Sequence, residues 1–132
     1  MPLVRPILTT PNPRLKVARN EVWLVNFDPT VGDEIQKTRP AVVISVNAAF
    51  RHRLQIVVPI TSWQQRFQND FWMIYLPASS ANGLANDSAA NAFQIKSISE
   101  DRFVRKIGLL DTVVMDDITT AVALCIGYNP QI

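Results

Sequence analysis

The 132-residue chain has little of several features on which common protein classes depend. It contains one cysteine, Cys125, so no disulfide can form within the chain and nothing indicates an oxidising compartment. No stretch reaches the ~18 apolar residues that a membrane-spanning helix needs. The N-terminal sequence MPLVRPILTTPNPR has no continuous apolar segment of the kind found in signal peptides. We therefore expect a cytoplasmic protein that does not associate with membranes.

Histidine is also scarce, since His52 is the only one. Two histidines therefore cannot share acid and base catalysis within one chain. The sequence has no His/Cys/Asp cluster with metal-ligand spacing, and neither GxxxxGK[ST] nor GxGxxG occurs in it. We expect no metal and no cofactor.

Net charge is low and unevenly distributed. The whole chain has a net charge of +2, but residues 1–20 contain four basic and no acidic residues. The remainder has nine basic and eleven acidic residues and is therefore slightly negative. A body of this kind does not bind nucleic acid by bulk charge, so any phosphate backbone must be bound by a local patch.

The chain divides into an arm and one domain. Residues 1–20 contain four prolines, a density that blocks helix and ladder formation, so we expect an extended or disordered basic arm. Both a loose tail and an arm that grips a partner fit this composition. Residues 21–132 are enough for one domain with its own core.

Apolar runs rich in β-favouring residues predict five strands. Turn residues separate them: the loop 28–38 contains Pro29 and Gly32, and the small-residue loop 78–91 surrounds Gly83. Pro40 can open the second strand, where a missing N–H is tolerated. The predicted strands are 21–27, 41–47, 54–62, 69–76 and 92–98.

The end of the chain changes period and predicts one α-helix. An apolar stripe at helical spacing consists of Val114, Ile118, Ala121, Val122 and Cys125. Asp111 or Thr112 can cap its start and Gly127 can end it. A single helical turn capped by Ser99 is predicted just before. These elements indicate a mainly β, α+β fold: a small barrel or strongly curved sheet with a helix packed on it.

One long segment resembles a known family. The sequence VWLVNFDPTVGDEIQKTRPAVVIS, residues 22–45, is similar to the opening of MazF/PemK toxins of type II toxin–antitoxin pairs, with their DPT-x-G-x-E loop followed by K-x-R-P-A-V-V-I-S. The shorter blocks VPITS, GL, QIKSI and RFVRKIG follow in the family's order. The resemblance covers about residues 21–127.

The resemblance implies a fold, an activity and partners. The fold would be an SH3-like β-barrel with a C-terminal helix, as in MazF and CcdB, and the assembly a homodimer. The activity would be metal-independent, sequence-specific endoribonuclease cleavage of single-stranded RNA such as mRNA. A cognate MazE-like antitoxin would block the site, and the toxin would meet DNA only through that antitoxin.

The resemblance also assigns residues to the site. The catalytic positions of the family fall on Arg39, Thr61 and Glu34. The expected RNA-binding residues are Lys37, Ser62, Trp63, Gln94 and Lys96, with Arg51 or Arg53 as further candidates. Two positions depart from the family: Ile98 stands where some members carry an Asp, and Asn20 replaces the usual Gly.

Structural alternatives remain for most of these residues. Arg39 could pair with Asp33 or Glu34 in its own loop. Thr61 fits a plain strand residue, and Glu34 fits a solvated loop acid. Three further residues are less tied to the site: Trp23 and Trp72 are expected in the core, and His52 is expected to be an exposed turn residue whose contact with RNA is open.

The resemblance leaves a second functional reading. The same fold also supports toxins that cut nothing and bind a protein target such as DNA gyrase. These would not need an arginine at the loop exit or the hydroxyls of PITS. A family member that binds RNA or antitoxin without cutting is a third reading.

Overall fold

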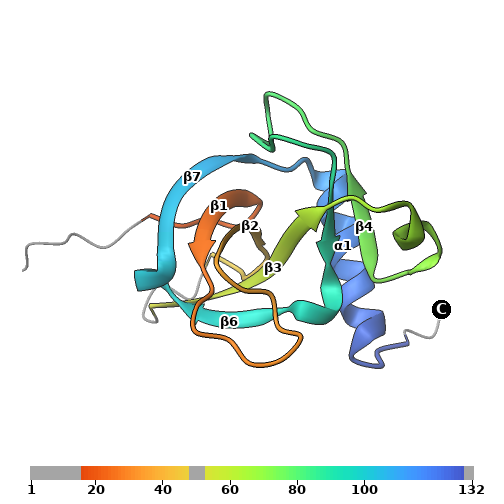
Figure 1. Cartoon of the computed structure of the whole chain (residues 1–132), viewed down its shortest axis with the longest axis horizontal. Helices are drawn as coiled ribbons and strands as arrows, with labels where there is room; N and C mark the ends of the chain where they lie inside the picture. The colour runs from red at the N-terminus through yellow and green to blue at the C-terminus, as the bar shows by residue number, and fades with distance from the viewer. Residues whose placement is uncertain (1–15, 48–52, 130–132) are drawn as a thin grey trace, which may run out of the picture.

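The computed structural model describes residues 16–47 and 53–129. Most of the predicted arm, together with Arg51 and His52, lies outside these ranges. Within them the chain forms a seven-stranded antiparallel sheet and one α-helix (Figure 1). The strands are β1 (Glu21–Asn26), β2 (Thr38–Val43), β3 (Leu54–Ser62), β4 (Met73–Leu76), β5 (Ser88–Asn91), β6 (Lys96–Ser99) and β7 (Phe103–Leu109). The helices are the short 3-10 turns η1 (Gln65–Asn69), η2 (Ala92–Gln94) and η3 (Glu100–Arg102), and α1 (Thr112–Cys125).

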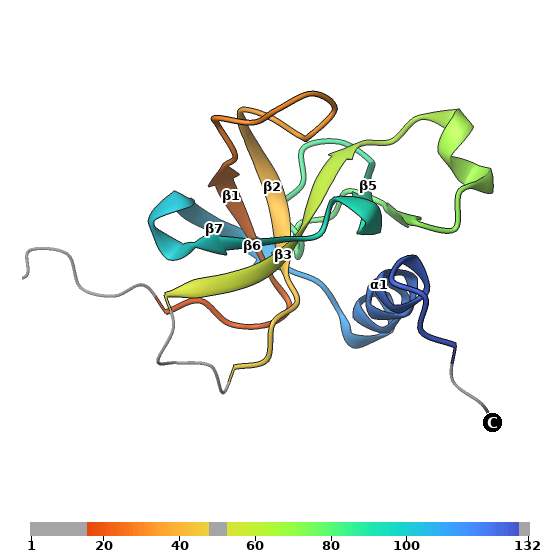
Figure 2. The same cartoon turned by 90° about the horizontal axis from the view of Figure 1, so that it is seen from below.

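The sheet is curled but open. Its strand order is β4-β5-β3-β2-β1-β7, and β6 pairs with β3 beside this path. Strands β7, β1, β2, β3 and β6 follow one another around the curve in Figure 1, while α1 packs to one side (Figure 2). The predicted mainly β architecture with a terminal helix is confirmed. The barrel is not closed, because within the described residues β7 pairs with neither β4 nor β6.

Alternation along the central strands fills two cores, one on each face of the sheet. Val22, Val42 and Val58 align across β1, β2 and β3, and their side chains join the core under α1. The intervening residues, including Trp23 and Ala41, face the interior of the curl. Trp23 is buried there with its ring edge against Phe103, as predicted for a core residue. Burial on both faces explains why these strands are continuous apolar runs.

Helix α1 begins and ends where the sequence indicates. The Asp111 side chain accepts a hydrogen bond from the Val114 backbone at 2.9 Å, and Gly127 adopts a left-handed φ of +85° just beyond the C-terminal cap. The buried face consists of Met115, Ile118, Ala121 and Val122. It matches the predicted stripe except that Met115 is buried, while Val114 and Cys125 are only partly buried.

Several predicted element bounds are wrong. Strand β2 begins at Thr38, so it includes Arg39 rather than starting after Pro40. Strand β4 begins at Met73 because residues 65–69 form η1 around the buried Phe67. Strand β6 begins at Lys96 because residues 92–94 form η2, whereas the predicted Ser99 cap is confirmed by its bond from the Asp101 backbone.

Two strands were not predicted at all. Strand β5 lies in the segment taken for a small-residue loop, because Ser88, Ala89 and Ala90 carry no β-favouring side chain. Their small size lets β5 sit buried between β3 and β4. Strand β7 is mostly exposed and charged at its centre, so its pairing with β1 decides its conformation.

Glu21 ties the start of β1 to its neighbours. Its carboxylate accepts hydrogen bonds from the Ala18 backbone at 2.9 Å and from Trp23 Nε1 at 3.0 Å, and it pairs with Lys106 at 3.1 Å. Burial alone would raise the pKa of this carboxyl. The hydrogen bonds from Ala18 and Trp23 and the charge of Lys106 outweigh burial and lower the pKa below its usual value of 4.5.

We predict that Glu21→Gln lowers the free energy of unfolding at neutral pH by about 1 kcal/mol, because the amide keeps the shape and loses the charge. A carboxyl with a lowered folded-state pKa stabilises the fold above its usual pKa, and that contribution is lost as pH falls. The difference between variant and wild type should therefore shrink below pH 4.5. Urea unfolding at a series of pH values measures this difference in unfolding free energy.

The exposed pair Arg53–Asp101 provides the control, since Asp101→Asn should change the unfolding free energy little. An effect of Glu21→Gln that does not depend on pH would contradict the prediction.

Candidate functional site

Strand pairing brings Arg39 and Thr61 together. The β2–β3 register pairs Ala41 with Pro59, and continuing it by two residues places Arg39 opposite Thr61. Both line a pocket of about 210 Å³ together with Ser62. Leu84, Ala85, Asn86 and Ser88 form another part of the pocket lining. Three of the predicted site residues therefore share one cavity at the ends of two neighbouring strands.

The Arg39 guanidinium has no acidic partner. Its Nε donates to the Gln36 carbonyl at 3.3 Å, and across the described residues no carboxylate pairs with it. The alternative of a salt bridge to Asp33 or Glu34 is therefore wrong. An arginine has five N–H donors, so the Nη groups of this partly buried side chain remain available to an anion in the pocket.

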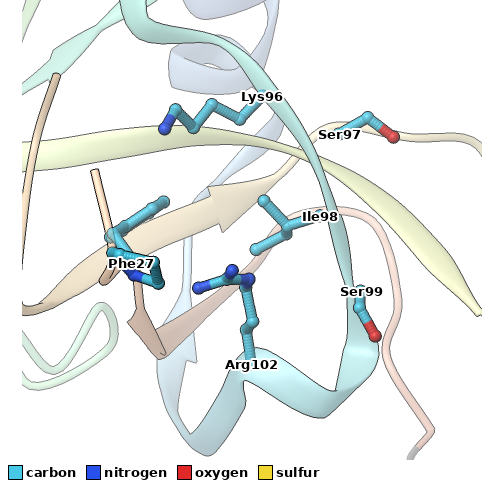
Figure 3. A pocket seen from close by; sticks show the side chains of 7 residues that line it. Phe27, Lys96, Ser97, Ile98, Ser99 and Arg102 are labelled. Carbon is cyan, nitrogen blue, oxygen red and sulfur yellow. The ribbon is translucent and has the colours of Figure 1, made fainter. Parts of the chain in front are cut away.

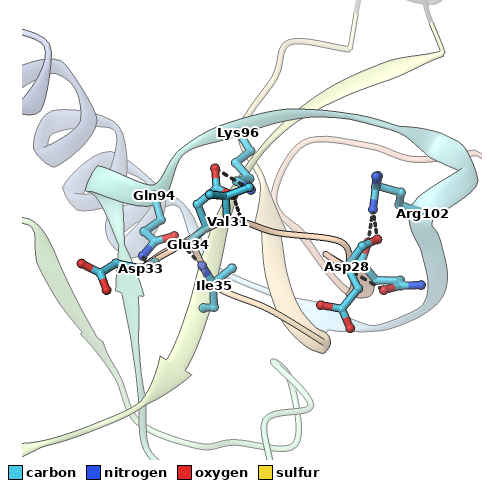
Figure 4. Close-up of polar contacts among 9 residues, drawn as sticks. Asp28, Val31, Asp33, Glu34, Ile35, Gln94, Lys96 and Arg102 are labelled. Atoms are coloured by element: carbon cyan, nitrogen blue, oxygen red, sulfur yellow. Dashed lines mark hydrogen bonds and ion pairs between the residues drawn. The ribbon is translucent and has the colours of Figure 1, made fainter.

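The β1–β2 loop, residues 27–37, is held by its own acids (Figure 4). Asp28 Oδ1 accepts from the Lys37 backbone at 2.8 Å, and Glu34 Oε1 accepts from the Val31 backbone at 2.7 Å. Lys37 has a φ of +67°, which non-glycine residues seldom adopt. Its side chain is exposed, one residue before β2 begins.

Glu34 lies apart from Arg39 and Thr61 in a different hollow. It lines a cavity of about 420 Å³ with Gln94 and Lys96. Glu34 Oε2 lies 3.7 Å from Lys96 Nζ, and the two side chains are 46% and 24% exposed. The structure thus divides the predicted catalytic trio: two members share a pocket, and the third belongs to the outer side of the loop.

Two residues from the 3-10 turns on either side of β6 hold the loop backbone. Gln94 accepts from Ile35 N at 2.8 Å and donates to the Asp33 carbonyl at 3.0 Å. Arg102 donates to the carbonyls of Asn26 and Asp28 at the base of the loop (Figure 4). Arg102 was not predicted to act here, although the RFVRKIG block contains it.

A third hollow, of about 320 Å³, is the most basic of the three (Figure 3). Lys96 and Arg102 line it, and no acid does. Phe27 and Ile98 supply apolar lining, with the Lys96 ammonium 6.0 Å from the Phe27 ring centre. Lys96 lines both this hollow and the one beside Glu34, so the two hollows adjoin.

The aromatic residues are arranged differently from the prediction. Trp63 is half-buried and packs edge-to-face against two other rings. The distance between ring centroids is 5.8 Å to Phe67 and 4.9 Å to Tyr75, so these rings already cover part of the Trp63 surface. Trp72 is not in a strand; it is partly buried and contacts the exposed rings of Phe71 and Phe93. Trp72 and Phe93 line the hollow beside Glu34.

Two features are absent from the described part of the chain. No group of three or more His, Cys, Asp or Glu side chains in residues 16–47 and 53–129 comes close enough to hold a metal ion. Over the same residues, no helix combines the length and apolar character that crossing a membrane would require.

Fold and site together define a small curled β protein whose strand ends present an unpaired arginine beside two hydroxyls. The chain belongs to the PemK-like, MazF-like toxins of type II toxin–antitoxin systems, whose family model matches residues 18–126. It is similar to endoribonuclease MazF9 of Mycobacterium tuberculosis, with 32% identity over 80% of this chain and 92% of the relative.

Solved structures show the same fold. MazF from Deinococcus radiodurans superposes with a TM-score of 0.71 at 20% identity, covering 84% of this chain and 96% of the other. A mycobacterial endoribonuclease in complex with its cognate antitoxin gives a TM-score of 0.68 at 20% identity, covering 88% of this chain and all of the other. The predicted family and fold class are confirmed.

We predict that Gly83→Ala destabilises the protein by about 2–4 kcal/mol, because a Cβ there would lie 1.9 Å from the Ile107 carbonyl oxygen. Gly83 precedes the segment that lines the Arg39 pocket. Gly32→Ala is the matched control: its φ is also positive, but nothing lies within 4 Å, so only the backbone cost of about 1–2 kcal/mol applies. Urea midpoints compare the two. Equal losses would show that the close approach to Ile107 does not matter.

Proposed function

We propose that this chain is a sequence-specific, metal-independent endoribonuclease that cleaves single-stranded RNA and thereby arrests translation and growth. The observation that carries the proposal is the open pocket shared by Thr61 and an Arg39 that no carboxylate neutralises. Membership of the MazF/PemK family and the similarity to a named endoribonuclease support it.

Cleavage of this kind starts with attack of a ribose 2′-OH on its own phosphate. The P–O5′ bond breaks, leaving a 2′,3′-cyclic phosphate and a 5′-OH. Arg39 suits the charge that develops on the phosphorane, because a guanidinium offers two parallel donors to two phosphate oxygens. The bond from Nε to Gln36 leaves the Nη edge for the phosphate. A donor of this type contributes about 10²–10³ in rate.

Thr61 and Ser62 supply hydroxyls on the opposite strand. Both line the pocket, Thr61 partly buried and Ser62 exposed. We assign Thr61 a hydrogen bond to the reacting phosphate and Ser62 a bond to an adjacent oxygen. Both lie on β3, where pairing with β5 holds their backbone, so the strand presents them to the pocket from a fixed position.

Glu34 is the third proposed catalytic residue and has the weakest support. Its two oxygens are occupied by the Val31 backbone and Lys96. It can accept the 2′ proton only after leaving at least one of these partners. A well-placed general base increases the rate by a factor of about 10²–10⁴. Glu34→Gln therefore distinguishes the two roles: a large loss of rate is expected if Glu34 is the base, and a small one if it is only a loop acid.

RNA would leave the pocket along the basic side of the loop. Lys37 and Lys96 are proposed to contact flanking phosphates, Lys96 from the hollow that it shares with Arg102. Trp63 is proposed to contact a base next to Ser62. Arg53 is less suited, since it already pairs with Asp101. Binding should weaken with salt, with a slope of roughly 0.7 per phosphate contacted on a single strand.

The proposed partners follow from the family. A mycobacterial relative has been solved with its cognate antitoxin, and we propose that a MazE-like antitoxin covers the Arg39 pocket of this chain. We also propose a homodimer, a cytoplasmic location and contact with DNA only through the antitoxin.

The first test is RNA cleavage by purified protein in EDTA. Discrete cuts in a long single-stranded RNA, with 2′,3′-cyclic phosphate and 5′-OH ends, are expected, and mapping the 5′ ends gives the sequence preference. RNA that stays intact at high enzyme concentration, with or without added Mg²⁺, would overturn the proposal. Cleavage that needs the metal would overturn only the metal-independent chemistry.

The second test is Arg39→Ala, which should lower kcat/KM by about 10²–10³. Arg53→Ala is the matched control, because this exposed arginine pairs with Asp101 away from the pocket and should change cleavage little. Both variants should keep the wild-type Tm. Growth arrest that survives Arg39→Ala while cellular RNA stays whole would instead indicate a protein target such as DNA gyrase.

A further inference from the structure

Gln94 forms a two-point clamp on the β1–β2 loop. Its side-chain oxygen accepts from Ile35 N and its side-chain nitrogen donates to the Asp33 carbonyl, across 59 and 61 residues of sequence. Figure 4 shows the side chain of Gln94 directed at the loop backbone. These two bonds use one of the two N–H donors of the amide and one of the two lone pairs on its oxygen, and they hold the amide plane against the loop backbone.

The clamp continues to Arg39 through the backbone. Gln36 follows Ile35 directly, and its carbonyl is the acceptor for Arg39 Nε. The contacts at the Asp33 carbonyl and the Ile35 N–H therefore restrict the path of the chain that leads into Gln36. The Gln36 carbonyl decides which edge of the guanidinium is engaged and which edge faces the pocket.

Other contacts do not replace the clamp in the middle of the loop. Arg102 acts at the base of the loop, and Asp28 acts on its C-terminal side, where it holds the Lys37 N–H of the peptide group that contains the Gln36 carbonyl. The Glu34–Lys96 pair is half-exposed and 3.7 Å long, so screening by solvent leaves it weak. Gln94 is thus the neutral, short-range connection between the sheet and the part of the loop that precedes Gln36.

We infer that Gln94 is a positioning residue for Arg39 and does not itself bind RNA. The inference rests on the proposed role of Arg39 in phosphate binding. It replaces the earlier expectation that Gln94 contacts the substrate. Small displacements of a catalytic group are costly, since an error of about 1 Å can reduce the rate about 10²-fold.

A double-mutant cycle tests the inference with the full chain. Gln94→Ala should lower kcat about tenfold, with KM for RNA within about twofold of wild type, because a misdirected donor loses transition-state stabilisation. In an Arg39→Ala background the same change should cost less than about twofold, since residues that act as a unit are not additive. Gln65→Ala is the matched control, because that exposed side chain bonds only Gln68 and should leave kcat unchanged. An effect of Gln94→Ala that persists in full without Arg39, or that shifts KM or the cleavage sequence, would show direct contact with RNA and overturn the inference.

A second measurement is independent of nuclease activity. In the ¹⁵N-labelled protein without RNA, Gln94→Ala should speed hydrogen exchange at the Ile35 amide and change the signal of Arg39 Nε–H, whereas Gln65→Ala should alter neither. Gln94→Glu keeps the acceptor for Ile35 but loses the donor to Asp33, so it should retain the protection of Ile35 while still changing the Arg39 signal. Unchanged exchange and an unchanged Arg39 signal in Gln94→Ala would overturn the clamp. If wild-type protein cuts no RNA, the proposed function fails, and these spectra still decide whether Gln94 positions Arg39.

Discussion

The antiparallel register between β2 and β3 is the constraint on which the site depends. The pairs run from Val43–Val57 to Ala41–Pro59, and the same register continued by two residues puts Arg39 opposite Thr61, where both line one small pocket. A slip of one residue would turn the side chains of a strand to the opposite face. Such a slip is strongly opposed here, because Val42 and Val58 on one face and Ala41 and Val57 on the other are all buried. The two cores therefore fix the chemistry as well as the fold.

The loop before β2 adds what strand pairing alone cannot supply. Register determines the position of the Arg39 backbone, but its long side chain can adopt many rotamers. The loop carbonyl of Gln36 restricts that freedom by engaging Nε. Hydrogen bonds from Gln94 and Arg102, in the turns that flank β6, in turn hold the loop backbone in place. A segment about 60 residues away in sequence thus takes part in orienting the guanidinium.

Much of this arrangement could be predicted from sequence, for identifiable reasons. The predicted bounds of strand β3 match the observed ones because β-branched residues dominate LQIVVPITS between turn signals, even though Pro59 lies within it. Strand β5 was missed because Ser88, Ala89 and Ala90 owe their conformation to the space between two other strands. The family motif located Arg39 and Thr61, but it could not indicate that Glu34 faces a different hollow or that Gln94 contacts the loop. Those facts depend on long-range contacts that no local pattern encodes.

The distribution of partners among the cations explains how a slightly acidic body can serve a polyanionic substrate. Lys96 pairs with Glu34, Lys106 with Glu21 and Arg53 with Asp101, while Arg102 donates to loop carbonyls. Arg39 resembles Arg102 in donating to a neutral carbonyl, and of these five cations it is the one that lines the pocket of Thr61 and Ser62. Arg39 is only partly buried and its bond to Gln36 is exposed, so water can solvate the guanidinium when no anion is present. A phosphate that enters the pocket can therefore meet an arginine without an acidic partner together with Thr61 and Ser62.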